Sequence, residues 1–186
     1  MKKKLLKVTA VFLSMVMVLS MGLVYAEDSG VPKRSEIPEQ YKWKLEHIYK
    51  TTEDWEKDYN MVMKELLPKI AEYKGQLNDP GKVLECLKLS DQIGIVVSRM
   101  YVYACMLSDQ DTADNAASEL ASRAESLYTA ASEAQSFIAP ELMKKSEGVI
   151  KQYYIDNPEF KDYKYYFTKL LDQKAHVLSD AEEKLL

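Results

Sequence analysis

Apolar residues recur at steps of three and four along most of the chain, which is the spacing of an α-helix. A first run follows the helix-start residues 51–54, is closed by Gly75, and contains Trp55, Tyr59, Val62, Leu66, Ile70 and Tyr73. Pro68 lies inside this run, where its missing backbone N–H predicts a bend in the helix. The pattern therefore predicts a bent first helix.

Two longer helices are predicted after it. The sequence Asn78-Asp79-Pro80 marks a helix start, because proline suits the first helical position. One face of that helix is predicted to hold Val83, Leu87, Gly94, Val97, Tyr101 and Ala104, with Leu84 and Met100 beside it. After the polar stretch 108–117, a third helix is predicted without a break through Ala113, Ala117, Leu120, Ala124, Leu127, Ala131, Ala134 and Ile138. This mostly alanine face lets a neighbouring helix approach closely.

The C-terminal third continues the helical pattern. Pro140 is expected to open a short segment that runs to Tyr154. The next start is Asn157-Pro158-Glu159, and the helix behind it carries Phe160, Tyr163, Phe167, Leu170 and Leu171. Ser179 and Glu182 then form a capping box, which predicts a further helix after residue 178.

The stretch before the first helix has a different pattern. Residues 27–33 are expected to be a flexible leader, and an aromatic arm follows with Ile37, Tyr41, Trp43, Leu45, Ile48 and Tyr49. No part of the chain alternates as a strand would. The predicted fold class is all-α, an array of antiparallel helices with an extended or short helical aromatic N-terminal arm laid across it.

Residues 1–26 have the three regions of a signal peptide: four lysines, an uncharged apolar run, and a small-residue ending. Cleavage is predicted between Ala26 and Glu27, which makes the protein secreted or extracytoplasmic with no stable membrane anchor after cleavage. The alternative is an uncleaved membrane anchor. Without those four lysines, 21 basic residues remain against 29 acidic ones, a net charge of −8. Such an acidic chain is not expected to bind nucleic acid.

The sequence contains no recognisable set of catalytic residues and no metal-ligand spacing. His47 and His176 are interpreted as structural or surface residues. Cys86 and Cys105 fall on one predicted helix about 28 Å apart, because each residue adds about 1.5 Å. A disulfide requires Cα atoms within about 7 Å, so two free, buried or half-buried thiols are predicted.

Tyrosines and phenylalanines crowd residues 152–167, and tyrosine suits both helix cores and peptide-binding surfaces. The favoured interpretation places Tyr153, Tyr163 and Phe167 in the core, and Tyr154, Tyr165 and Tyr166 at its margin. The alternative is a surface that binds extended peptides.

Several blocks of the sequence, in this order, resemble the N-terminal region of the oligoendopeptidase F family of zinc peptidases. They are IPEQYKWKLEHIYKTTEDWEKDY, YVYACMLSDQDTADN, FIAPELM and NPEFKDYKYYFTKLLDQKAHVLSDAEEKLL. The resemblance covers roughly residues 34–186. It implies a helical region that precedes a larger catalytic domain, the two enclosing a channel for short peptides. In that family the zinc ligands and the general base lie in an H-E-x-x-H helix of the catalytic domain, which this sequence does not contain.

The resemblance implies that residues 34–178 form the helical N-terminal domain of an exported zinc oligoendopeptidase, and that 179–186 begin a helix of a missing downstream region. The chain alone is then inactive, with no cofactor of its own and zinc in the missing catalytic domain. That domain and short peptides are its expected partners, and the channel-lining residues are not identified. The alternative is a free-standing secreted helical module that binds peptides or acts as a scaffold.

Overall fold

The computed structural model describes residues 30, 32, 34–174 and 176, and every regular element in this part is helical. The all-α prediction is therefore confirmed. No helix among these residues is long and apolar enough to cross a membrane. The chain divides into two units after Lys42. The first contains the short 3-10 helices η1 (Arg34–Glu36) and η2 (Glu39–Tyr41). The second unit is described below by itself.

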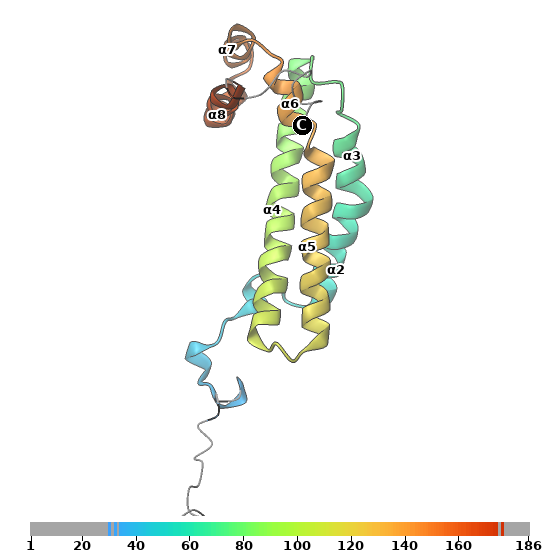
Figure 1. Cartoon of the computed structure of the whole chain (residues 1–186), viewed down its shortest axis with the longest axis vertical. Helices are drawn as coiled ribbons and strands as arrows, with labels where there is room; N and C mark the ends of the chain where they lie inside the picture. Colours follow the sequence, from blue (N-terminus) through green and yellow to red (C-terminus); the bar gives the residue numbers. More distant parts are fainter. Residues whose placement is uncertain (1–29, 31, 33, 175, 177–186) are drawn as a thin grey trace, which may run out of the picture. The chain divides into compact units, whose positions relative to one another are not determined.

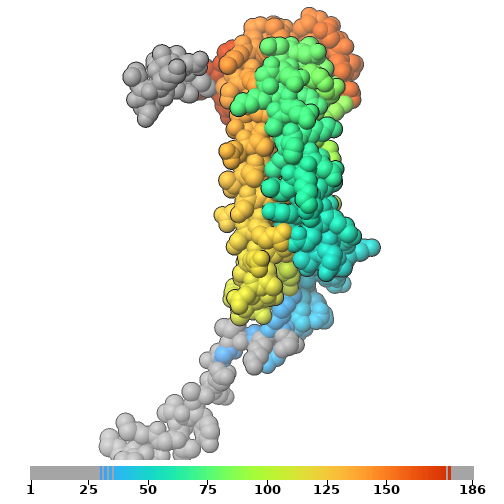
Figure 2. Space-filling view, turned by 90° about the vertical axis from the view of Figure 1, so that its right-hand side faces the viewer, coloured from blue at the N-terminus to red at the C-terminus, as the bar shows by residue number. Residues whose placement is uncertain are grey.

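The second unit is built around a long antiparallel helical hairpin. Its elements are η3 (Leu45–His47), α2 (Thr52–Met61), η4 (Val62–Leu66), α3 (Leu67–Ala71), α4 (Pro80–Gln110), α5 (Asn115–Gln135), α6 (Ile138–Met143), α7 (Glu147–Asp156), η5 (Pro158–Tyr163) and α8 (Lys164–Lys174). Helices α4 and α5 form the hairpin, and α2 and α3 pack along one side of it (Figures 1 and 2). The short helices α6, α7 and α8 lie at the end where α4 begins (Figure 1).

The segment from α2 to α3 is the predicted first helix. The Thr51 hydroxyl caps it by accepting the backbone N–H of Asp54 at 3.2 Å. Just before Pro68 the helix widens into the π-helical turn η4. Proline lacks the N–H that would bond the carbonyl of Lys64 four residues earlier, so the α-helical pattern is interrupted there. Gly75 has a φ of 79°, a left-handed conformation that suits glycine after a helix end.

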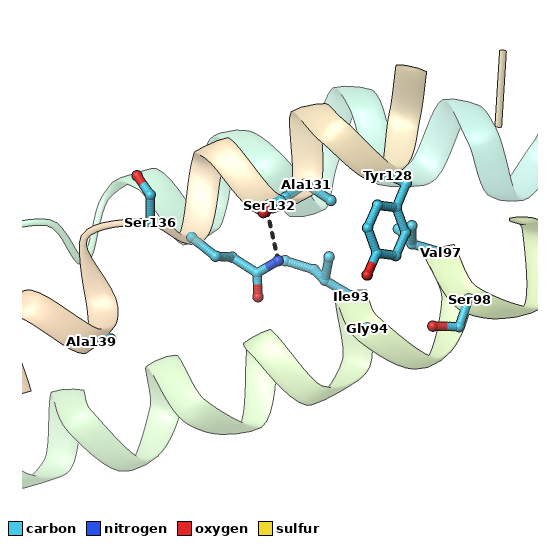
Figure 3. Close-up of a pocket in the computed structure, with 10 residues that line it drawn as sticks. Ile93, Gly94, Val97, Ser98, Tyr128, Ala131, Ser132, Ser136 and Ala139 are labelled. Carbon is cyan, nitrogen blue, oxygen red and sulfur yellow. Dashed lines mark hydrogen bonds between the residues drawn. The ribbon is translucent and has the colours of Figure 1, made fainter. Parts of the chain in front are cut away.

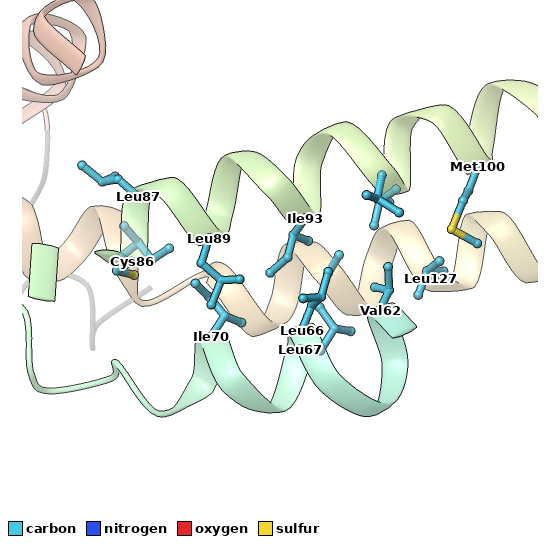
Figure 4. Close-up of a cluster of buried hydrophobic side chains, with 14 of the residues drawn as sticks. Val62, Leu66, Leu67, Ile70, Cys86, Leu87, Leu89, Ile93, Met100 and Leu127 are labelled. Carbon is cyan, nitrogen blue, oxygen red and sulfur yellow. The ribbon is translucent and has the colours of Figure 1, made fainter. Parts of the chain in front are cut away.

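A continuous apolar core joins these helices. Trp55, Val62, Ile70, Ile93 and Met100 are fully buried where α2, η4 and α3 meet α4. Figure 4 shows side chains of these helices meeting between α4, α5 and the η4–α3 segment. Alanines on the buried face of α5 are small enough to let α4 pack closely, as the alanine-rich pattern predicted; the buried members are Ala117, Ala124 and Ala131.

The prediction of an unbroken third helix is wrong. Helix α5 ends at Gln135, and Ile138 instead begins α6. Pro140 explains the break, because it cannot donate a hydrogen bond to the carbonyl of Ser136 and its ring crowds that turn. Pro140 also lies inside α6 rather than opening a segment, and Ser146 caps the separate helix α7 by accepting the N–H of Val149 at 3.3 Å.

The predicted face of α4 is wrong at two positions. Gly94 and Tyr101 are exposed, whereas Ile93 and Val96 are buried. Helix α4 packs against both α5 and the α2–α3 segment, so its buried face is wider than one stripe. The apolar positions alone did not indicate which side of the stripe these neighbours cover.

Both cysteines are free, as predicted. Cys86 is fully buried in α4, and burial raises the pKa of its thiol to about 11. Cys105 is half-buried on the same helix. The two thiols therefore lie on one straight element, which explains why they do not pair.

Candidate functional site

The residues predicted for signal cleavage, Ala26 and Glu27, lie outside the described part of the chain and remain a prediction. His47 and His176 are both exposed. Among the described residues, no group of three His, Cys, Asp or Glu side chains could hold a metal ion. The described residues therefore do not fit a zinc site.

The tyrosine-rich segment mainly builds the core, in agreement with the favoured interpretation. Tyr153 and Phe167 are buried, and the ring of Tyr153 stacks on Phe160 at 4.9 Å between centroids. The tyrosines expected at the margin are half-buried or exposed: Tyr154, Tyr165 and Tyr166. Tyr163 is only half-buried, because its hydroxyl reaches outward and donates to a carboxylate oxygen of Asp91 at 2.7 Å.

A polar cluster attaches the end of the aromatic arm to the helices. The Tyr49 hydroxyl donates to Asp58 Oδ2 at 2.6 Å and accepts from Arg99 Nε at 3.0 Å. Arg99 also pairs with Asp58 at 2.5 Å, and its guanidinium lies 4.9 Å from the centre of the Tyr49 ring. Burial and the Asp58 hydrogen bond raise the pKa of Tyr49 to about 12. These contacts join Tyr49 to α2 through Asp58 and to α4 through Arg99.

A groove runs along the hairpin on the outer side of the α4–α5 contact. It has a volume of about 430 Å³ and is lined by Ile93, Gly94, Val97, Ser98, Tyr128, Ala131, Ser132, Gln135, Ser136 and Ala139. Figure 3 shows Tyr128 and Ser132 on α5 facing Gly94 and Ser98 on α4 across this space. Gly94 leaves the groove open, since a Cβ built there would meet nothing within 4 Å.

Two tyrosines extend the groove along the hairpin. Tyr101 of α4 and Tyr128 of α5 have ring centroids 5.7 Å apart, and they are 37% and 54% exposed. Cys105 lies one turn after Tyr101 on α4, and its thiol raises the pKa of Tyr101. Glu125 lies one turn before Tyr128 on α5. The result is an accessible aromatic surface with one acidic neighbour.

No charged side chain lines the groove itself, so its preference for a charged ligand depends on the neighbouring residues of α4 and α5. The basic residues of α4 and α5 are all paired with carboxylates: Lys82 with Glu85, Lys88 with Glu159, Arg99 with Asp58, and Arg123 with Glu56. In contrast, no ion pair is recorded for Glu125 within the described residues. The groove therefore favours a cationic ligand over an anionic one.

This groove was not predicted from the sequence. Tyr128 is the only aromatic residue of α5, and it lies one turn after Ala124 and one turn before Ala131, at the edge of the alanine face. Gly94 lies in the middle of α4 without breaking the helix. An exposed aromatic residue and a mid-helix glycine were thus visible signals, but only the packing of α4 on α5 places them together.

Comparisons with known proteins agree with this fold. The family model described as Oligopeptidase F (Peptidase_M3_N) matches residues 141–186. The chain is 36% identical over 169 residues to Oligopeptidase PepF of Bacillus subtilis, covering 89% of this chain and 25% of that protein. It is 37% identical over 158 residues to the plasmid Oligoendopeptidase F of Lactococcus lactis subsp. cremoris, covering 82% of this chain and 26% of that protein.

Solved structures give the same match. A peptidase from Chlamydophila abortus superposes with a TM-score of 0.73 at 26% identity, covering 84% of this chain and 26% of that one. An oligoendopeptidase F from Enterococcus faecium superposes with a TM-score of 0.62 at 32% identity, covering 73% and 26%. The chain thus spans about a quarter of the length of the relatives that it matches. Together the sequence and structural matches show that this chain belongs to the oligoendopeptidase F family, as its N-terminal helical domain.

Proposed function

We propose that this domain is the N-terminal wall of an exported zinc oligoendopeptidase, where it lines one side of a channel and limits substrates to short peptides. The observation that carries the proposal is the extent of the matches: Oligopeptidase PepF aligns with 89% of this chain but only 25% of its own length. The remaining length of such a protein has room for the catalytic domain. That domain and the peptide substrates are the proposed partners.

The zinc chemistry is assigned to that catalytic domain. A zinc peptidase needs three protein ligands, an activated water and a general base. The role of this chain in the proposal is to bound the space through which a peptide reaches that centre. The long α4–α5 hairpin suits this role, because its two helices form an extended surface with a groove between them.

The test is to sequence the DNA after the Leu186 codon. We expect an open frame of several hundred further codons that includes H-E-x-x-H on a predicted helix and a glutamate further on. The physical reason is that one helical wall cannot activate water or polarise a peptide carbonyl. A stop codon directly after Leu186, with a monomeric and cooperatively folding product, would contradict the proposal. It would favour the free-standing peptide-binding or scaffold module.

The prediction of export rests on the signal-peptide pattern of residues 1–26. We expect the secreted protein to begin at Glu27 because the small residue Ala26 ends the apolar run at a signal-peptidase site. N-terminal sequencing of protein from the culture medium measures this directly. The matched control is Ala26→Phe, which should block processing because the cleavage pocket accepts only small residues. Intact Met1 in a membrane fraction of the unaltered protein would show an uncleaved anchor instead.

A further inference from the structure

We propose that the groove between α4 and α5 binds a peptide through one apolar side chain and a cationic side chain about three residues away. This inference rests on the proposed function only in taking peptides as the ligand class. The groove is concave, open, and lined by side chains of α4, α5 and α6. Its volume of about 430 Å³ lies within the usual range for ligand sites.

The apolar part of the ligand is inferred from the groove lining. Ile93, Val97 and Ala131 form its floor, Tyr128 stands at one end, and Gly94 leaves the space that a side chain would otherwise fill. The lining residues Ser98, Ser132 and Ser136 supply hydroxyl groups along the edges, where the backbone of a bound peptide would need partners. An aromatic or large aliphatic side chain is the group that fits this floor.

The cationic side chain of the ligand is inferred from the charges of α4 and α5. Glu125 is exposed on α5 one helical turn before Tyr128, and no described residue forms an ion pair with it. The four basic residues of α4 and α5 are neutralised by Glu85, Glu159, Asp58 and Glu56. A basic side chain of a ligand would therefore find an acidic partner here without competition from a neighbouring cation. The two exposed tyrosine rings add a surface that also attracts cations.

The separation between the apolar and the cationic residue of the peptide follows from helix geometry. Ser132, in the groove wall, is seven residues from Glu125 on the same helix, which is about 10 Å at 1.5 Å per residue. An extended peptide advances about 3.3 Å per residue, so about three residues span that distance. A peptide with an apolar residue in the groove thus places its third neighbour beside Glu125.

The experiment is an NMR titration of the purified chain with two blocked nonapeptides. Both have a central Phe among alanines; one has Lys three positions to either side of it, and the other has Glu there. We expect the Lys peptide to bind about threefold more tightly, since an exposed ion pair contributes modestly. We also expect 0.5 M salt to reduce this preference. Shifted resonances should belong to Gly94, Ser98, Tyr128 and Ser132.

Four variants separate the contributions. Glu125→Gln should abolish the preference for the Lys peptide, whereas Glu119→Gln, an exposed glutamate of the same helix with no recorded partner, should leave it unchanged. Gly94→Phe should fill the groove and weaken both peptides about fivefold or more. Gly94→Ala should retain binding and the fold, because its Cβ meets nothing within 4 Å.

Equal affinity for the two peptides, or shifts confined to another surface, would overturn the inference. Concentration-dependent dimerisation through the same residues would overturn it too, because the occupant would then be a second copy. These outcomes are independent of the DNA beyond Leu186. If the reading frame continues into a peptidase but the groove binds neither peptide, only the groove proposal is refuted. If the groove binds the Lys peptide but a stop codon follows Leu186, only the channel-wall function is refuted.

Discussion

Replacing Trp55 with alanine is expected to destabilise the protein by about 3–5 kcal/mol, the cost of removing a fully buried large side chain. Trp55 is 0% exposed, and its indole N–H donates to the carbonyl of Met100 at 3.1 Å. Its ring also stacks on Tyr59 at 5.3 Å between centroids and lies 5.2 Å from the guanidinium of Arg123. The substitution removes the contact between α2 and the middle of α4.

Trp43 is the matched control for this experiment. It is the other tryptophan of the chain and is 51% exposed, so Trp43→Ala is expected to change stability by no more than about 0.5 kcal/mol. Urea unfolding followed by far-UV circular dichroism measures both variants. Trp55→Phe should lie between them, because it keeps most of the buried volume and loses the hydrogen bond. Similar midpoints for Trp55→Ala and Trp43→Ala would show that the α2–α4 contact is not central to the fold.

Replacing Phe167 with alanine is expected to cost a similar amount, about 3–5 kcal/mol, but in a different part of the molecule. Phe167 is 0% exposed and contacts Tyr153, Tyr154, Phe160 and Tyr166 with ring centroids 5.6 to 6.3 Å apart. These rings form an aromatic cluster that holds α7, η5 and α8 together. Removing its central ring should therefore loosen this end of the molecule first.

Hydrogen exchange measured by mass spectrometry can locate that loss. Peptides from α7 and α8 should lose protection in Phe167→Ala, while those from the middle of α4 and α5 keep most of theirs. The control is Tyr165→Ala, two residues earlier on the same helix, where the ring is 74% exposed and little stability should be lost. Uniform loss of protection in Phe167→Ala would instead show that the whole unit unfolds as one cooperative block.

The positions of helix starts could be read from local sequence because capping is a local interaction. Thr51, Asp79 and Asn157 each accept a backbone N–H two or three residues ahead, and all three were recognised without tertiary information. Gly75 and Pro68 were informative for the same reason, since each restricts the backbone of its own or the preceding turn. Pro140 had the same local effect, but the continuous apolar rhythm across it favoured an unbroken helix.

The sequence by itself determined that the chain is helical, where most helices begin, which thiols stay unpaired, and which family it resembles. All of these depend on residue spacing or on short backbone interactions. Only the tertiary structure decided that Gly94 and Tyr101 face outward, and that Tyr128 meets them across a groove. The reason is that an apolar stripe specifies a buried face only when the positions of the neighbouring helices are known. Helix α4 packs against both α5 and the α2–α3 segment, and a groove exists only between packed elements.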